Sequence, residues 1–195
     1  TDSMDSIRTL PALVAAMNDI VDRCTNERDR IRGALDAMSR FLPHALETEL
    51  ATLPPGDQKY SRHLVHADPE DRFSLLALVW RPGQGTPIHD HPSWGVLGVA
   101  SGRMKFVNYG EERVDGQRCL MPIETFIGSA GSVGTVFPPH IDIHRMANAD
   151  PNEIAISLHA YGCEVKEFSI YSAETAECRP ASAKYDSRLS LVLQS

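Results

Sequence analysis

The feature that most constrains the fold is a change in the spacing of apolar residues near residue 60. Before this point, apolar residues recur every three or four positions, which is the period of an amphipathic helix. After it, short apolar and aromatic runs are separated by turn residues at intervals of about 8 to 12 residues, a spacing typical of all-β domains. The sequence therefore predicts a β-structure preceded by helices.

Three helices are predicted in the first part of the chain. One apolar stripe runs from Ser6 to Cys24, and a second begins after Asn26, a favourable N-cap, and stops before Pro43. A short third helix is predicted over His44 to Leu53. The segment PPGD then ends the helical region.

Eight strands are predicted in the second part. They are Tyr60 to His66, Phe73 to Trp80, Trp94 to Ala100, Met104 to Tyr109, Gly134 to Phe137, Ile143 to Ala147, Ile154 to Tyr161 and Val165 to Tyr171. Short, evenly spaced strands of this kind are typical of a small antiparallel barrel or jelly roll. We expect one domain over residues 1–195, with a helical segment at 1–55 packed on a β-barrel at 56–195.

Composition and charge argue against several classes of function. The chain has 19 basic and 26 acidic residues, a formal net charge of -7, and no basic cluster that would follow a phosphate backbone. No run of about 18 apolar residues occurs, and the first residues lack the pattern of a signal peptide. We expect a cytoplasmic protein that binds neither nucleic acid nor membrane, and the sequence carries no signal for an oligomeric state.

Two histidines one residue apart, in the segment PIHDHPSWG, are candidate metal ligands. Side chains at positions i and i+2 of a strand project from the same face, so His89 and His91 can share one cation. The pair alone is a weak signal because the chain has eight histidines. A packed or surface-exposed pair is the alternative.

The surroundings of the pair resemble the two signature motifs of the cupin superfamily. The first motif spans residues 83–102, and the second lies in GTVFPPHIDIHRMAN. The resemblance implies a jelly-roll barrel that holds a metal on adjacent strands, with His89, His91 and His144 as ligands. His140 is a rival third ligand, and we prefer His144 because it keeps the motif spacing.

One position departs from the usual cupin pattern. Most cupins have a glutamate ligand where this chain has Gly95, which offers no side chain. The site then consists of three neutral imidazoles, and such a facial set leaves open positions for a substrate and dioxygen. Because histidine leaves the charge of a divalent ion uncompensated, an anionic ligand such as a thiolate is favoured.

A second polar group lies in the segment ISLHAYG. Ser157, His159 and Tyr161 alternate along one predicted strand, so they face the same side and can form a hydrogen-bonded chain. The alternative is an ordinary polar face of an edge strand.

Four segments together, YSRHL, PIHDH, HIDIHRMAN and SLHAYG, resemble the thiol dioxygenases, specifically the bacterial relatives of cysteine dioxygenase. The resemblance implies a non-haem Fe(II) on the three histidines, with Ser157, His159 and Tyr161 as an outer-sphere triad. Arg62 matches the arginine that binds the substrate carboxylate in cysteine dioxygenases, where 3-mercaptopropionate dioxygenases typically carry glutamine. A guanidinium can pair with both carboxylate oxygens. Tyr60, on the same face, would help to line the pocket.

The activity that this resemblance implies is oxidation of L-cysteine to cysteine sulfinic acid, so the expected partners are a small-molecule thiol and O2. A 3-mercaptopropionate dioxygenase and a non-enzymatic, metal-binding cupin are the alternatives.

Gly95 also bears on a covalent modification. In mammalian cysteine dioxygenases the matching residue is a cysteine, joined by a thioether to the tyrosine that matches Tyr161. Glycine has no sulfur, so we expect Tyr161 to be unmodified here. Cys163 is a poor substitute because it lies beside Tyr161 on the same predicted strand.

Overall fold

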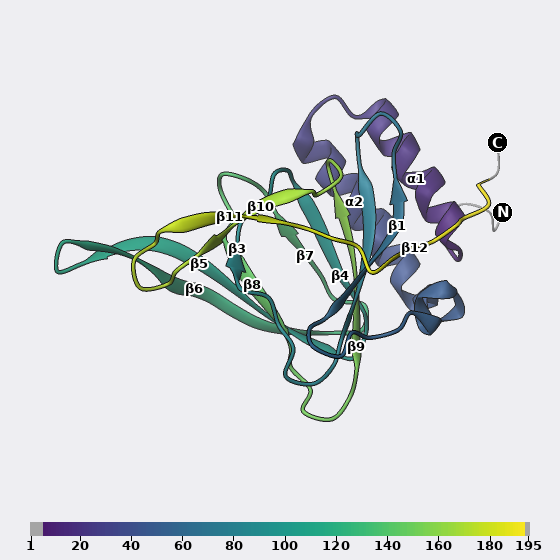
Figure 1. Cartoon of the computed structure of the whole chain (residues 1–195). Coiled ribbons are helices and arrows are strands. Elements are labelled where there is room, and N and C mark those ends of the chain that lie inside the picture. Colours follow the sequence, from purple (N-terminus) through teal and green to yellow (C-terminus); the bar gives the residue numbers. More distant parts are fainter. Residues whose placement is uncertain (1–5, 194–195) are drawn as a thin grey trace.

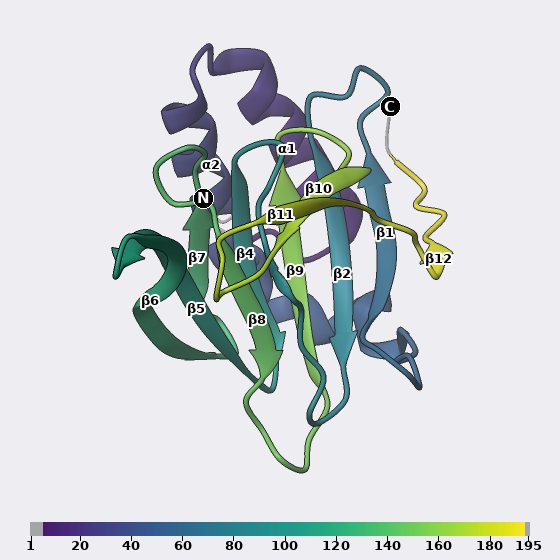
Figure 2. The same cartoon turned by 60° about the vertical axis from the view of Figure 1, so that its left-hand side comes forward.

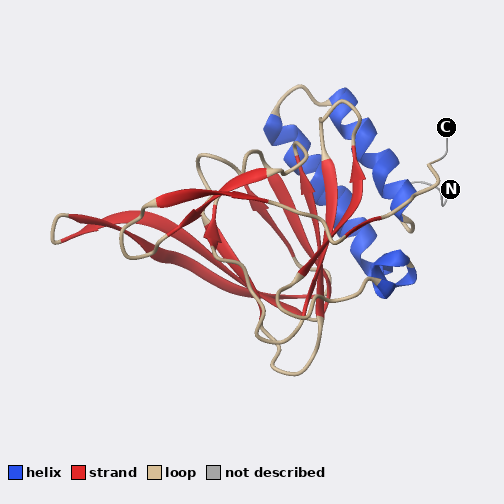
Figure 3. Cartoon of the chain, in the orientation of Figure 1, coloured by secondary structure: helices blue, strands red, loops and turns tan. Residues whose placement is uncertain are grey.

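The computed structural model describes residues 6–193 and shows helices grouped on one side of a body of β-strands (Figure 1; Figure 3). The first five and last two residues of the expected domain lie outside this range. Helices α1 (Leu10–Arg23) and α2 (Glu27–Phe41) confirm the first two predicted helices. The Thr9 side chain caps α1, and the Asn26 side chain caps α2 by accepting from the backbone N–H of Asp29.

The third predicted helix is not one continuous helix. The segment forms two short 3₁₀ helices instead, η1 (Leu42–Glu47) and η2 (Glu49–Thr52). Between them Thr48 has an extended backbone, its hydroxyl donates to the Ala45 carbonyl at 2.6 Å, and its side chain caps η2. This local hydrogen bonding competes with a continuous α-helix.

The strands form two six-stranded sheets, seen from two directions in Figure 1 and Figure 2. The first has the order β12-β1-β2-β9-β4-β7 and the second the order β11-β10-β3-β8-β5-β6. Their bounds are β1 (Ser61–Ala67), β2 (Ser74–Trp80), β3 (Ile88–His89), β4 (Gly95–Ser101), β5 (Arg103–Val114), β6 (Gln117–Ser129), β7 (Val133–Val136), β8 (His144–Asn148), β9 (Ala155–Tyr161), β10 (Glu167–Tyr171), β11 (Cys178–Ser182) and β12 (Ser187–Arg188). All eight predicted strands are present with shifted ends, and the predicted β-barrel with N-terminal helices is confirmed.

Strand β6 is the largest element that the sequence did not predict. It pairs with β5 in a long hairpin that extends beyond the rest of the sheet (Figure 1). Asp115 and Gly116 both have positive φ at the turn, as a tight hairpin requires. Pro122 argues against a strand in the sequence, but here it lies beside a register shift on an edge strand, where a missing N–H is tolerated.

The first sheet is covered on both faces. On its outer face, Leu75 of β2 belongs to one buried cluster with Leu13 of α1 and Phe41 of α2. Leu76 and Leu78 point the other way, into a second cluster between the sheets. Strand β2 is buried along its whole length, which explains its uninterrupted apolar run. The space between the sheets also holds the polar groups described next.

Within residues 6–193, the structure has no helix with the length and apolar composition needed to cross a membrane.

Candidate metal centre and pocket

Three histidines converge between the sheets. The ligand atoms of His89, His91 and His144 all lie within 4.8 Å of one another. His89 ends β3 and pairs directly with His144, the first residue of β8. His140, the rival ligand, is exposed in a turn and packs on Phe137, outside this group.

The expected two-histidine strand is shorter than predicted, because β3 ends at His89. Asp90 leaves the regular ladder: its carboxylate accepts from the backbone N–H of Ser169 at 2.6 Å and from the Tyr171 hydroxyl at 2.9 Å. His91 therefore reaches the group from the following loop, with its ring centroid 4.9 Å from that of His89.

Hydrogen bonds orient two of the rings. Nδ1–H of His89 donates to the Pro87 carbonyl at 2.9 Å, and Nδ1–H of His91 donates to the carbonyl and carboxylate oxygens of Asp142, both at 3.0 Å. Each Nε2 is then left with a free lone pair. Nε2 of His91 is buried without a hydrogen-bond partner among the described residues. A metal ion at this point would satisfy it.

The environment of His89 and His144 favours the neutral imidazole. Burial lowers the pKa of His144 well below its usual value, and the neighbouring rings lower it further. His89 lines the pocket and is partly exposed, yet desolvation and the nearby His91 also lower its pKa. Neutral imidazole is the form that binds a metal.

A buried chain of hydrogen bonds lies beside the histidines. Indole Nε1–H of Trp80 donates to Oγ of Ser157 at 2.9 Å, Ser157 Oγ lies 2.7 Å from Nε2 of His159, and Nδ1 of His159 lies 3.0 Å from the Tyr161 hydroxyl. All four residues are buried. The alternative of an ordinary edge-strand face does not apply, because β9 lies between β2 and β4 in the sheet.

Trp80 sets the direction of this chain. An indole N–H can only donate, so the Ser157 oxygen accepts from Trp80 and the Ser157 hydrogen goes to Nε2 of His159. His159 then carries its proton on Nδ1 and donates to the Tyr161 oxygen. The reverse order would leave the buried Ser157 hydrogen with no acceptor among the described residues, at a cost of about 1 to 3 kcal/mol. The phenol hydrogen of Tyr161 is thus free to donate into the pocket.

The pKa shifts agree with this direction. Burial lowers the pKa of His159 to about 3 and raises the pKa of Tyr161 above its usual value. The first is therefore a neutral imidazole and the second a protonated phenol at physiological pH.

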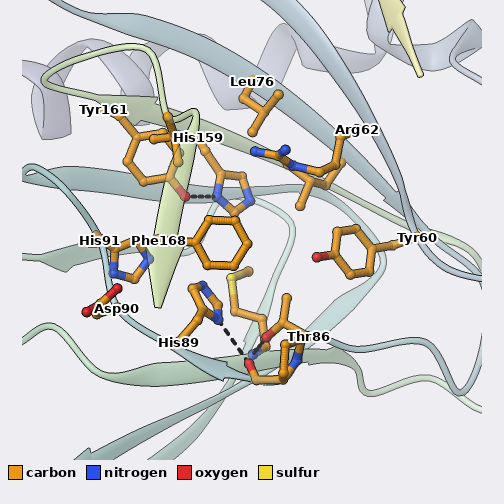
Figure 4. Close-up of a pocket in the computed structure, with 14 residues that line it drawn as sticks. Tyr60, Arg62, Leu76, Thr86, His89, Asp90, His91, His159, Tyr161 and Phe168 are labelled. Atoms are coloured by element: carbon orange, nitrogen blue, oxygen red, sulfur yellow. Dashed lines mark hydrogen bonds between the residues drawn. The ribbon is translucent and has the colours of Figure 1, made fainter. Parts of the chain in front are cut away.

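His89, His91 and Tyr161 line one pocket together with Arg62 and Tyr60 (Figure 4). Arg62 on β1 and Tyr161 on β9 belong to the same sheet, whereas His89 lies on the other. Tyr60 stacks on Trp80, with ring centroids 4.4 Å apart. The positive charge of Arg62 lowers the pKa of His159, although burial has the larger effect. All predicted ligand, triad and substrate-binding residues are therefore brought into one region.

Gly95 lies directly across from Tyr161 in the β4–β9 pair. A Cβ atom at Gly95 would lie 2.8 Å from Cδ1 of the Tyr161 ring. Absence of a side chain thus lets the ring pack against the backbone of β4.

Sequence reasoning missed two residues of this region. Trp80 lies on the same face of its strand as Leu76 and Leu78, and this position was the available signal. An aromatic residue on an apolar strand is, however, normally interpreted as a core residue. Asp142 lies two positions before His144, and its position in HIDIHRMAN was the available signal.

The facing sheets and the three convergent histidines define a cupin barrel with the geometry of a metal site. The family model for cysteine dioxygenase type I matches residues 2–174, and the chain belongs to this family.

The chain is also similar in sequence to curated proteins of that family. Human cysteine dioxygenase type 1 is 29% identical over 116 residues, which cover 58% of this chain and 56% of the human protein. The rat protein of the same name is 25% identical over 156 residues, covering 79% of this chain and 74% of the rat protein. The chain thus spans about half of the human relative's length.

Solved structures similar to this chain include an uncharacterised protein with a double-stranded β-helix domain from Klebsiella pneumoniae, at 17% identity and a TM-score of 0.45, covering 69% of this chain and 89% of that one. A cupin superfamily protein from Desulfitobacterium hafniense has 9% identity and a TM-score of 0.43, covering 59% and 87%.

Replacing Trp80 by Phe should allow both directions of donation along the hydrogen-bonded chain, because Ser157 then no longer accepts a hydrogen bond from an indole. In metal-free protein, ¹⁵N NMR of the imidazole nitrogens should show His159 as the Nδ1–H tautomer in the wild type and as a mixture in Trp80→Phe. Trp94→Phe, at the other tryptophan of the chain, is the matched control. An unchanged tautomer in Trp80→Phe would contradict the assignment.

Tyr161 should stay free of any cross-link. After exposure of the protein to iron, oxygen and cysteine, peptide mass mapping should find the peptides of Gly95 and Tyr161 separate and at unmodified masses. Gly95→Cys should allow a linked peptide that is lighter by two hydrogens. Gly98→Cys should not, because a side chain there faces Met38 and Leu42 of the helical region. A wild-type adduct between Tyr161 and any cysteine would refute the expectation.

Proposed function

We propose that the chain is an iron-dependent thiol dioxygenase that oxidises L-cysteine to cysteine sulfinic acid with dioxygen. One observation carries the proposal: three imidazoles converge, one has a buried nitrogen with no partner among the described residues, and two of them line a pocket that also contains an arginine. Groups that can donate lone pairs to a metal ion and a group that can bind an anion are thereby combined. Membership of the cysteine dioxygenase type I family supports the same reading.

The histidines fit a metal ion. His89, His91 and His144 would hold Fe(II), and Asp142 would fix the His91 ring. When bound, the iron supplies the redox chemistry that adds both oxygen atoms of O2 to the sulfur. The histidine-only set favours an anionic thiolate as a further ligand.

Arg62 would bind the substrate carboxylate. It lines the pocket opposite the histidines, and within residues 6–193 its guanidinium forms no ion pair with an acidic side chain. The charge therefore stays available for a substrate anion. This favours a thiol that carries a carboxylate.

Tyr161 would act as a hydrogen-bond donor. Its oxygen accepts from His159, so its own hydrogen can orient a polar group of the substrate in the pocket. Ser157 and Trp80 act through His159 by fixing its tautomer. No strong general base is required, since metal binding favours the deprotonated thiol.

Loss of any ligand should remove both metal and activity. His89→Ala, His91→Ala and His144→Ala should each retain little iron after anaerobic loading, measured by metal analysis, and should consume no oxygen when L-cysteine is added. His140→Ala is the matched control and should keep full iron and activity, because this side chain lies outside the group. Full iron occupancy in His144→Ala would refute the ligand set. A wild-type protein that binds iron but consumes no oxygen with any thiol would favour a non-enzymatic cupin.

Arg62→Gln should weaken use of L-cysteine. Loss of a paired, partly desolvated guanidinium costs about 2 to 4 kcal/mol, or about 30- to 900-fold in kcat/KM. Competition between L-cysteine and 3-mercaptopropionate should favour L-cysteine in the wild type, and Arg62→Gln should reduce that preference. Arg118→Gln, at an exposed arginine that pairs with Glu111 in the β5–β6 hairpin away from the pocket, serves as control. An unchanged preference in Arg62→Gln would place carboxylate recognition elsewhere.

A further inference from the structure

Residues 184–189 run along the outer edge of the pocket wall. Strand β12 pairs in parallel with β1, with Ser187 opposite His63 and Arg188 opposite Leu64 (Figure 2). This segment lies beyond residues 2–174, which the family model matches.

Both backbone polar groups of Arg62, the N–H and the carbonyl, form hydrogen bonds with Asp186. The Arg62 N–H donates to Oδ2 of Asp186 at 2.8 Å, and the Asp186 N–H donates to the Arg62 carbonyl at 2.7 Å. Ser187 adds a contact with the neighbouring residue, since its hydroxyl lies 2.6 Å from Nδ1 of the buried His63. These contacts of residues 186 and 187 thus fix the backbone of β1 at Arg62.

The same segment holds the guanidinium. Nη1 of Arg62 donates to the Lys184 carbonyl at 3.3 Å, and its Cζ lies 5.4 Å from the centroid of the Tyr185 ring. At this distance the ring face attracts the cation. Burial and the nearby Glu164 raise the pKa of Tyr185 to about 12, so the ring is a neutral phenol.

These contacts leave the charge of Arg62 uncompensated. The guanidinium meets a carbonyl and a neutral ring, while the Asp186 carboxylate binds a backbone N–H instead. The nearby Glu164 pairs with two other cations: its Oε2 lies 3.7 Å from Nζ of Lys166, and its Oε1 lies 3.8 Å from Nη2 of Arg188. An ion pair at Arg62 would also have fixed the side chain, but it would have competed with an anionic substrate.

We infer that residues 184–186 are a specificity-determining segment, with Tyr185 as the positioning residue that holds Arg62 ready for a substrate carboxylate. The inference rests on the proposed role of Arg62. Ordering a long, flexible side chain before the substrate arrives improves binding by removing an entropic cost from the binding step. The benefit applies only to thiols that carry a carboxylate.

The test compares L-cysteine with cysteamine, which is L-cysteine without its carboxylate. Tyr185→Leu should lower kcat/KM for L-cysteine by about five- to tenfold, mainly through KM, and leave cysteamine within about twofold. Tyr185→Phe keeps the ring and should match the wild type. Asp186→Ala, which frees the Arg62 backbone, should cause the same selective loss as Tyr185→Leu. In Arg62→Gln, adding Tyr185→Leu should cause no further loss, because Tyr185 acts through Arg62.

Anaerobic binding of both thiols, measured by calorimetry, separates this inference from the proposed activity. A wild type that binds L-cysteine more tightly than cysteamine but oxidises neither would refute the activity, and the effect of Tyr185→Leu on the affinity difference would still decide the role of the segment. Equal losses for both thiols in Tyr185→Leu, or no loss for L-cysteine, would overturn the inference. Additive losses of kcat/KM for L-cysteine in the double variant Arg62→Gln, Tyr185→Leu would also overturn it.

Discussion

The pairing of His89 with His144 across β3 and β8 is the contact on which the site depends. It joins two segments that are distant in the chain and places their imidazoles side by side. Strand β3 has only two residues, and β8 on one side and β10 on the other hold it in place. His91 then needs only a short loop and the two hydrogen bonds that it donates to Asp142 to complete the group. The approach of His89 to His144 is therefore a product of sheet register.

Burying so many polar groups is costly, and the barrel offsets the cost by pairing them. Trp80, Ser157, His159 and Tyr161 satisfy one another in sequence, and Asp142 satisfies one nitrogen of His91. The lone pair of His91 Nε2 stays unpaired among the described residues. Buried polar atoms are rarely left in that state without a reason, which makes this atom the strongest local argument that the site can hold a cation.

Much of this arrangement could be predicted because it rests on periodicity. The helical stripes, the strands and the alternation of Ser157, His159 and Tyr161 are local patterns, and the structure brings those side chains to the same face. Strand β6 could not be recognised because Pro122 and its exposed face hide the pattern. Trp80 and Tyr185 matter through contacts with residues far along the chain, and such contacts leave no trace in local spacing.

The two halves of the pocket have different mechanical supports. Tyr161 and His159 lie on β9, which has a fully paired neighbour on each side and is buried along its whole length. Arg62 lies on β1, whose outer neighbour is the two-residue strand β12. Under the proposed function, the half that holds Tyr161 is therefore built on a central, fully paired strand, while the half that would select the substrate depends on a short edge segment. Substrate range can drift in evolution through changes in that edge, with the chemistry of the centre left intact.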